Sequence, residues 1–206
     1  MLVLAAGFSS RLGRPKALAR IRGVSLLSRT VDVLAACVPS SALPGRIIVV
    51  VPPRSYRYRF ELRGRGISFV ANSRRVSGLS SSVRLGIRQV RFGPAVLIVP
   101  VDLARLQIKD IKQLIAKWRA ARRRLVATRT LHYGGTPLIL PRRFYSQGMH
   151  IHGDTGLRNF VRTLPCADLA LVDLPHAALD VDTPQDLLQA RRRHSICQRP
   201  VRQIRL

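Results

Sequence analysis

Residues 2–16 read Leu-Val-Leu-Ala-Ala-Gly-Phe-Ser-Ser-Arg-Leu-Gly-Arg-Pro-Lys. This stretch places a short apolar strand directly before a glycine-rich loop. A loop after the first strand of a parallel sheet lies at the carboxyl edge of that sheet, where ligands bind. Its glycines let backbone N–H groups approach phosphate oxygens closely, and Arg11 and Lys16 add mobile positive charge. The stretch therefore predicts phosphate binding, and the alternative is a tight strand-to-helix turn that carries surface cations.

Two well-known phosphate-binding motifs do not describe this loop. Lys16 follows Pro15 rather than a glycine, and no Ser or Thr comes after Lys16, so the loop is not a Walker loop. The spacing of its glycines also differs from the G-x-G-x-x-G dinucleotide fingerprint.

Apolar runs of strand length alternate with amphipathic segments along the rest of the chain. This alternation predicts an α/β fold, a three-layer sandwich with a mostly parallel central sheet. We expect a single domain over residues 1–193, and then a basic, disordered tail over residues 194–206. The expected strands are residues 2–6, 46–51, 67–70, 95–101, 125–128, 137–140 and 169–173. The expected helices start at Ser25 as N-cap and after Gly78, and cover residues 54–63 (weakly patterned), 108–118, 154–163 and 184–193.

Composition limits the classes of partner. The net charge of +26 permits nucleic-acid binding, but the basic residues are spread along the chain, so we favour this role less. No apolar run reaches the roughly 20 residues of a membrane span, and no signal peptide precedes the first strand. We therefore expect a soluble, cytoplasmic protein without a membrane partner.

The cysteines and histidines suggest no metal or redox site. Cys37, Cys166 and Cys197 lie far apart, which is typical of reduced thiols. His150 and His152 lack a third ligand, and the remaining three histidines, His132, His176 and His194, are isolated.

Acidic residues are scarce, so each one that follows a strand is informative. Asp102 ends the apolar strand that starts at Ala95. A lone carboxylate there is costly to bury unless it is paired or binds a metal, and Mg²⁺ prefers one or two carboxylates plus phosphate oxygens. The segment Asp-Val-Asp-Thr-Pro-Gln-Asp, residues 180–186, places two more carboxylates before a helix that starts with proline. We expect Asp182 to face a metal and Asp180 and Asp186 to be structural. A helix start without a metal is the alternative.

Two polar segments have both a ligand-binding and a structural interpretation. The serine-rich start of the helix after Gly78 offers hydroxyls and free N–H groups to a sugar or phosphate, or else forms an N-cap. Asp154 either binds a substrate or caps the helix that follows it.

The pattern Leu-Ala-Ala-Gly-x-Ser-x-Arg-x-Gly-x-x-Lys resembles the signature of the molybdenum cofactor (MobA-like) nucleotidyltransferases. These have a nucleotide-diphospho-sugar transferase-like, Rossmann-like fold. Four later segments are also similar: Asn72 with residues 78–86, Asp102, residues 135–140 with residues 153–158, and residues 180–186. Two positions depart from the family pattern, because Asp-Leu-Ala at residues 102–104 replaces Asp-x-Pro, and Thr136 stands where histidine is frequent.

The resemblance implies a role for each matched position. Lys16, Arg11 and Asp102 would be catalytic, and Asp102 and Asp182 would hold Mg²⁺, with Mn²⁺ as an alternative. The implied nucleotide-binding residues are Leu4, Ala5, Ala6, Gly7, Ser9, Arg11, Gly13, Lys16, Asn72, Gly78, Ser80, Ser81 and Ser82. The implied acceptor-binding residues are Gly135, Thr136, Pro137, Asp154 and Arg158.

The resemblance also implies a reaction. Relatives that use CTP tend to have Ala-Ala-Gly in the first loop, as here, and those that use GTP tend to have Ala-Gly-Gly. The expected activity joins CMP from CTP to the terminal phosphate of molybdopterin, releases pyrophosphate and supplies a molybdenum enzyme. One alternative is the same chemistry with GTP or with a phosphosugar. Another is a non-catalytic homologue that binds the cofactor or nucleic acid, which the Asp-Leu-Ala departure and the high charge support.

Overall fold

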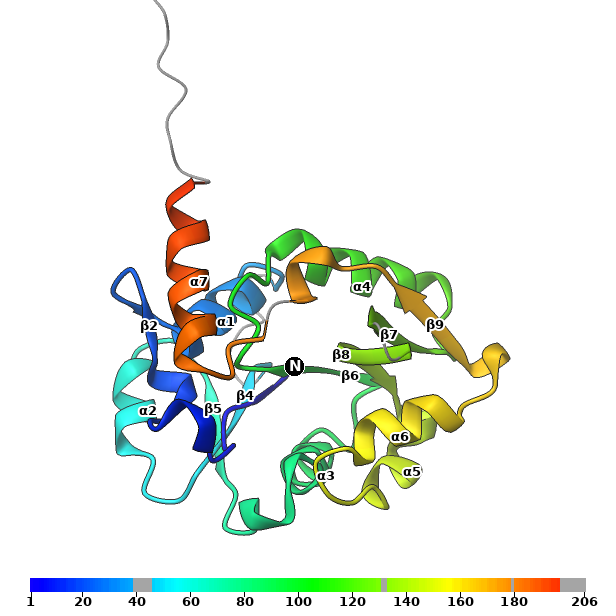
Figure 1. The fold of residues 1–206 in the computed structure, drawn as a ribbon. Helices are drawn as coiled ribbons and strands as arrows, with labels where there is room; N and C mark the ends of the chain where they lie inside the picture. Colours follow the sequence, from blue (N-terminus) through cyan, green and yellow to red (C-terminus); the bar gives the residue numbers. More distant parts are fainter. Residues whose placement is uncertain (39–45, 131–132, 179, 197–206) are drawn as a thin grey trace, which may run out of the picture.

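A seven-stranded sheet in the order β5-β4-β1-β6-β8-β7-β9 forms the centre of the computed structural model (Figure 1). The structure describes residues 1–38, 46–130, 133–178 and 180–196. Strand β8 is antiparallel to both of its neighbours, and the other paired strands of the sheet are parallel. The strands are β1 (Leu2–Leu4), β4 (Ile48–Val51), β5 (Ser68–Ala71), β6 (Ala95–Pro100), β7 (Leu125–Thr130), β8 (Tyr133–Pro141) and β9 (Leu169–Val172).

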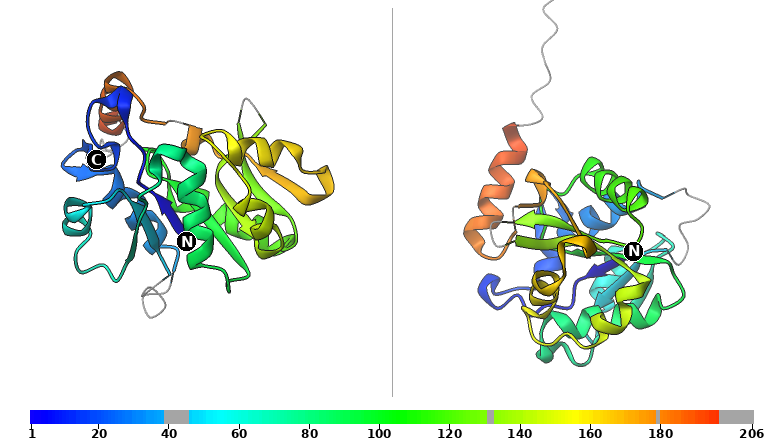
Figure 2. Two further views of the ribbon diagram at one scale, coloured as in Figure 1. Left: turned by 90° about the horizontal axis from the view of Figure 1, so that it is seen from below. Right: turned by 90° about the vertical axis from the view of Figure 1, so that its right-hand side faces the viewer.

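Helices cover both faces of this sheet, so the predicted three-layer α/β architecture is confirmed (Figures 1 and 2). One face packs against α1 (Leu26–Ala35), α4 (Ile108–Ala120) and α7 (Pro184–Ile196). The other face packs against α3 (Leu79–Gln89), α5 (Tyr145–Met149) and α6 (Gly156–Thr163). The short helix α2 (Tyr56–Glu61) joins the first core through Tyr58.

Strand β1 lies between β4 and β6 and is buried on both faces. Because successive strand residues point to opposite faces, Val3 and Ala5 belong to one core, and Leu2, Leu4 and Ala6 belong to the other. Burial of these apolar side chains fixes the strand, and the loop that follows it therefore starts from a rigid position.

Several elements differ from the sequence-based expectation. Strand β1 ends at Leu4 rather than residue 6, and β8 is longer than residues 137–140. Sequence patterning missed α5 and the hairpin of β2 (Arg20–Ile21) and β3 (Val24–Ser25). The hairpin turns at Arg22 and Gly23, which both have positive φ, as a two-residue type I′ turn requires.

Two helix starts illustrate capping. Ser25 is the N-cap of α1, as predicted, and its side chain accepts a hydrogen bond from Ser28 N at 3.0 Å. At the start of α4, Asp110 forms a capping box with Gln107, and its carboxylate also contacts Nδ1 of His176 at 3.2 Å. The expectation that His176 is isolated was therefore wrong.

The C-terminal helix is longer than expected. Helix α7 continues to Ile196, three residues beyond the predicted end, and the rest of the predicted tail, residues 197–206 with Cys197, lies outside the described residues. Within the described part of the chain, none of the helices combines the length and apolarity that crossing a membrane requires.

The close contact of α3 with β1 gives a test of the fold. A Cβ added at Gly86 would overlap the side chain of buried Leu2. Although alanine favours a helix over glycine, we expect Gly86→Ala to lower the free energy of unfolding by about 1–3 kcal/mol, because the core is overpacked. Denaturant unfolding measures this, with Arg88→Ala on the exposed side of α3 as control. An unchanged stability of Gly86→Ala would contradict the packing.

Candidate active site

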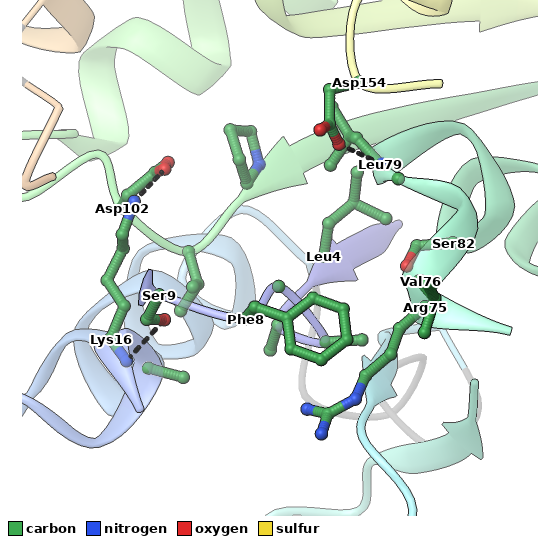
Figure 3. A pocket seen from close by; sticks show the side chains of 17 residues that line it. Leu4, Phe8, Ser9, Lys16, Arg75, Val76, Leu79, Ser82, Asp102 and Asp154 are labelled. Atoms are coloured by element: carbon green, nitrogen blue, oxygen red, sulfur yellow. Dashed lines mark hydrogen bonds and ion pairs between the residues drawn. The ribbon is translucent and has the colours of Figure 1, made fainter. Parts of the chain in front are cut away.

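A cleft of about 320 Å³ opens at the carboxyl ends of β1 and β6 (Figure 3). The opening loop, the end of β6 and the start of α3 form its walls, so the cleft lies where the parallel sheet leaves polar backbone groups and loops exposed. Its lining residues are Leu4, Ala5, Ala6, Gly7, Phe8, Ser9, Lys16, Ala17, Arg75, Val76, Gly78, Leu79, Ser82, Pro100, Val101, Asp102 and Asp154.

Ser9 holds the opening loop in its curved form. Its backbone is left-handed, with φ of 54°, and its side chain accepts a hydrogen bond from Lys16 N at 2.9 Å. This hydrogen bond joins the two ends of the loop, so the side chain of Lys16 starts from a fixed position. A Cβ at Gly7 would meet no atom within 4 Å, which leaves open space above the loop for a ligand.

Four charged side chains meet at one end of the cleft. Nζ of Lys16 lies 3.0 Å from Oδ2 of Asp102 and also donates to Oδ1 of Asp182. The other oxygen of Asp182 accepts from the guanidinium of Arg11 at 2.8 Å. The structure thus brings together the predicted catalytic and metal-binding residues Arg11, Lys16, Asp102 and Asp182, although Asp182 is 166 positions from Lys16.

Backbone pairing places the two carboxylates side by side. Val181 N donates to the carbonyl oxygen of Asp102 at 3.0 Å, and Leu103 forms an isolated antiparallel bridge with Asp180. Asp186 then fixes the turn, because its carboxylate accepts from the backbone N of Asp182 at 3.0 Å. Hydrogen bonds to Asp186 from Thr183 hold the pKa of Asp186 below its ordinary value.

The pKa values of these side chains are shifted because the charged groups lie close together and are partly buried. Burial of the Lys16 ammonium opposes its charge, but the adjacent Asp102 and Asp182 raise its pKa above the ordinary value. Partial burial likewise opposes the charge of Asp182, yet Lys16 and Arg11 lower its pKa. Loss of solvent together with the charges of Asp102 and Asp182 raises the pKa of Asp180 to about 6, and the opposing charge of Lys16 is too weak to reverse this.

The carboxylates of Asp102 and Asp182 fit a hard divalent cation. Both reach the same ammonium, so they converge on a point where a positive charge is already stabilised. No group of three or more His, Cys, Asp or Glu side chains suited to a metal occurs among the described residues. Two carboxylates completed by phosphate oxygens and water is the arrangement that Mg²⁺ favours.

Most polar residues of the segment from Asn72 to Ser82 support the wall of the cleft rather than line it. The buried amide of Asn72 donates to Oγ of Ser81 at 2.8 Å and to Oγ of Ser82 at 2.9 Å, and its oxygen accepts from Arg74 N. Ser80 donates to the carbonyl oxygen of Gly153. Among the predicted nucleotide-binding residues of this segment, Gly78 and Ser82 line the cleft, whereas Asn72, Ser80 and Ser81 support them.

Asp154 caps α3 rather than the helix that follows it. Its Oδ1 accepts from Leu79 N at 2.8 Å, and Ser80 N donates to the carbonyl oxygen of Gly153 at 3.2 Å. Helix α6 has Thr155 at its N-cap, without a side-chain capping bond. The alternative that Asp154 caps its own helix was therefore wrong, and the residue lines the cleft while it satisfies the start of α3.

The other predicted acceptor residues do not line this cleft. Gly135, Thr136 and Pro137 lie on β8, and the Thr136–Pro137 peptide bond is cis. The carbonyl oxygen of Pro137 accepts from Thr128 Oγ1 at 2.7 Å, which ties β8 to β7. Arg158 is exposed on α6, and its charge acts to lower the pKa of Asp180.

Among the cleft residues that sequence reasoning missed, Phe8 and Arg75 have side chains suited to ligand binding. Phe8 occupies the variable place after Gly7, and Arg75 lies between Asn72 and Gly78. Neither position is fixed by the family pattern. Two sequence features could have indicated them: an aromatic residue within a polar loop, and an arginine shortly before a glycine turn.

Comparison with known proteins places this geometry in a family. Residues 1–169 match the family model described as MobA-like NTP transferase domain. A bifunctional IPC transferase and DIPP synthase of Rubrobacter xylanophilus is 40% identical over 102 residues, which are 47% of this chain and 22% of that protein. A probable molybdenum cofactor guanylyltransferase of Trichormus variabilis is 28% identical over 190 residues, which are 90% of this chain and 87% of that protein.

A solved structure supports the same fold. The protein Rv0371c of Mycobacterium tuberculosis H37Rv superposes with a TM-score of 0.73 at 24% identity, covering 93% of this chain and 96% of that chain. The structure of that protein in complex with manganese superposes with a TM-score of 0.70 at 22% identity.

The cap on α3 gives a second test. We expect Asp154→Ala to lower the free energy of unfolding by about 0.5–2 kcal/mol, because the Leu79 amide loses its acceptor. Asp154→Asn keeps an acceptor oxygen and should retain most of the stability. Denaturant unfolding of both variants measures this. Equal losses in the two variants would show that the charge of Asp154, rather than its capping bond, stabilises this region.

Proposed function

The chain belongs to the MobA-like NTP transferase family and is a nucleotidyltransferase, and from that premise we propose that it transfers CMP from CTP to the terminal phosphate of molybdopterin. The observation that carries the proposal is the convergence of Lys16, Asp102 and Asp182 beside the glycine loop. Family membership argues for catalysis rather than for a non-catalytic homologue. We further propose residues 1–193 as a single catalytic domain.

The first loop supports CTP as the nucleotide. It reads Ala5-Ala6-Gly7, the form typical of relatives that use CTP, and the side chains of Ala5 and Ala6 are buried against the sheet. Two curated relatives named as probable molybdenum cofactor guanylyltransferases support GTP as the second candidate. A pterin phosphate is the favoured acceptor because of these names, and a phosphosugar is the alternative.

The residues of the cleft divide the work of the reaction. The loop amides near Gly7 and the cations Lys16 and Arg11 hold the triphosphate. Lys16 leaves the two carboxylates and pairs with phosphate oxygens, because one ammonium cannot neutralise the carboxylates and the phosphates at the same time. Asp102 and Asp182 would hold a divalent ion, Mg²⁺ or else Mn²⁺. Such an ion would supply positive charge that offsets the negative charge developing on the phosphate oxygens. The manganese complex of the Mycobacterium tuberculosis protein supports use of a divalent ion.

The transfer itself needs no protein nucleophile. An oxygen of the acceptor phosphate forms a bond to the α-phosphorus of CTP, and the bond from that phosphorus to the bridging oxygen of the β-phosphate breaks. Pyrophosphate leaves with both electrons of the broken bond. Positioning and charge stabilisation supply most of the rate acceleration in such a reaction, and Lys16 and Arg11 stabilise the leaving charge.

Nucleotide choice is tested by pyrophosphate release. With Mg²⁺ and molybdopterin present, we expect release to be fastest with CTP among CTP, GTP, ATP and UTP supplied in turn. Asp102→Asn should abolish release with every nucleotide, because one metal-holding carboxylate is lost. Release with GTP alone would overturn the cytidylyl assignment and support the guanylyl alternative.

The contact of Lys16 with both carboxylates predicts an unusual effect on metal binding. Lys16→Met removes the ammonium that competes for Asp102 and Asp182, so we expect Mn²⁺ alone to bind about tenfold more tightly, or about 1.4 kcal/mol. CTP turnover should be lost in the same variant. Electron paramagnetic resonance of free Mn²⁺ measures the affinity.

Arg14→Met is the matched control for this measurement. Arg14 is an exposed cation of the same loop and does not line the cleft, so both affinity and turnover should stay near the wild-type values. Weaker binding of Mn²⁺ by Lys16→Met than by the wild-type protein would contradict the competition between lysine and metal.

A further inference from the structure

The cations around the cleft are not equally available to a ligand. Lys16 and Arg11 contact the carboxylates of Asp102 and Asp182, which neutralise much of their charge. Arg75 also lines the cleft, and none of the salt bridges among the described residues includes Arg75. Among the cations that line the cleft, Arg75 is therefore the one whose charge is least neutralised by carboxylates and most available to an anionic ligand.

Phe8 holds the guanidinium of Arg75 at the cleft. The Cζ atom of Arg75 lies 4.3 Å from the centroid of the Phe8 ring. Phe8 comes from the opening loop, and Arg75 comes from the single turn of 3-10 helix at Arg75–Ser77 before α3, so the contact joins two walls of the cleft (Figure 3). A cation–π contact restrains the guanidinium but uses no oxygen acceptor, and the N–H donors of Arg75 remain for a ligand.

We infer that Arg75 is a further triphosphate-binding residue of this cleft and that Phe8 positions it. The inference rests on the proposed function, because it takes the ligand to be a nucleoside triphosphate. Arginine suits this role, since its planar fork of donors matches phosphate oxygens and its face stacks on aromatic rings. Lys16 and Arg11 contact carboxylates when no ligand is bound and must give up these contacts to pair with phosphate. An additional cation without an acidic partner has no such contact to give up and therefore strengthens binding of a polyanion.

Another interpretation of the same pair is that Phe8 stacks on the nucleobase. More than half of the Phe8 surface is exposed, at 53%, so its ring is accessible to a base. The two roles differ in one respect: a phosphate-binding Arg75 acts on any polyphosphate, whereas a stacking Phe8 acts only on ligands that carry a base. Inorganic pyrophosphate, which has phosphates and no base, separates them.

The experiment measures binding of pyrophosphate and of CTP to the full-length protein by isothermal titration calorimetry with Mg²⁺. We expect Arg75→Ala to weaken the binding of both ligands about tenfold or more, because a charge-assisted hydrogen bond is lost. Arg75→Lys should recover part of the loss. Arg74→Ala is the matched control, because it removes the same charge from the adjacent exposed position outside the cleft lining, and it should change binding less than twofold.

Variants of Phe8 test the positioning role. Phe8→Ala should weaken pyrophosphate binding by a few-fold, and Phe8→Tyr should restore it. Combining Phe8→Ala with Arg75→Ala should weaken binding no further than Arg75→Ala does, because the two residues act as a unit.

Two outcomes overturn the inference. One is unchanged pyrophosphate binding in Arg75→Ala together with weaker CTP binding, which would assign the pair to the base. The other is a loss in Arg74→Ala as large as that in Arg75→Ala, which would show only a general charge effect. If the wild-type protein releases no pyrophosphate with any nucleotide, while Arg75→Ala still weakens pyrophosphate binding, the proposed function fails and the phosphate-binding role of Arg75 stands.

Discussion

The ammonium of Lys16 connects parts of the chain that are far apart in sequence. It contacts Asp102 at the end of β6 and Asp182 before α7, and its own backbone is fixed by Ser9. Without this positive charge, the carboxylates would repel one another at a partly buried position, which is costly. The same two carboxylates are the ones that we propose for a divalent cation, because carboxylate oxygens suit such an ion.

The sheet supplies the rigidity that this group of charges requires. Strand β1 is buried between β4 and β6, so the loop after it and Asp102 start from neighbouring fixed strands. The pairing of Val181 with Asp102 then brings the last acidic segment to the same edge. On the opposite wall, Asp154 and Asn72 support the start of α3 through hydrogen bonds to Leu79 and Ser81.

Much of this arrangement could be predicted from the sequence, because it depends on local patterns. The apolar run before Asp102 and the Ser25 cap are short-range signals. Ser25 caps α1 as predicted, and β6 has the predicted start and ends one residue earlier, at Pro100. The direction of β8 could not be predicted in this way, since it depends on pairing with β6 and β7 rather than on its own residues. The role of Asp154 was missed for a similar reason: a cap is expected within a few residues of its helix, and this one acts across 75 positions.

We propose that Lys16 and a divalent cation occupy the site between the carboxylates of Asp102 and Asp182 in turn. A crystal structure with Mn²⁺ and a non-hydrolysable CTP analogue, using anomalous scattering of manganese, tests it most directly. We expect one anomalous peak at coordination distance from an oxygen of each carboxylate, with Nζ of Lys16 moved onto phosphate oxygens. A peak elsewhere, with Lys16 still in contact with both carboxylates, would contradict it.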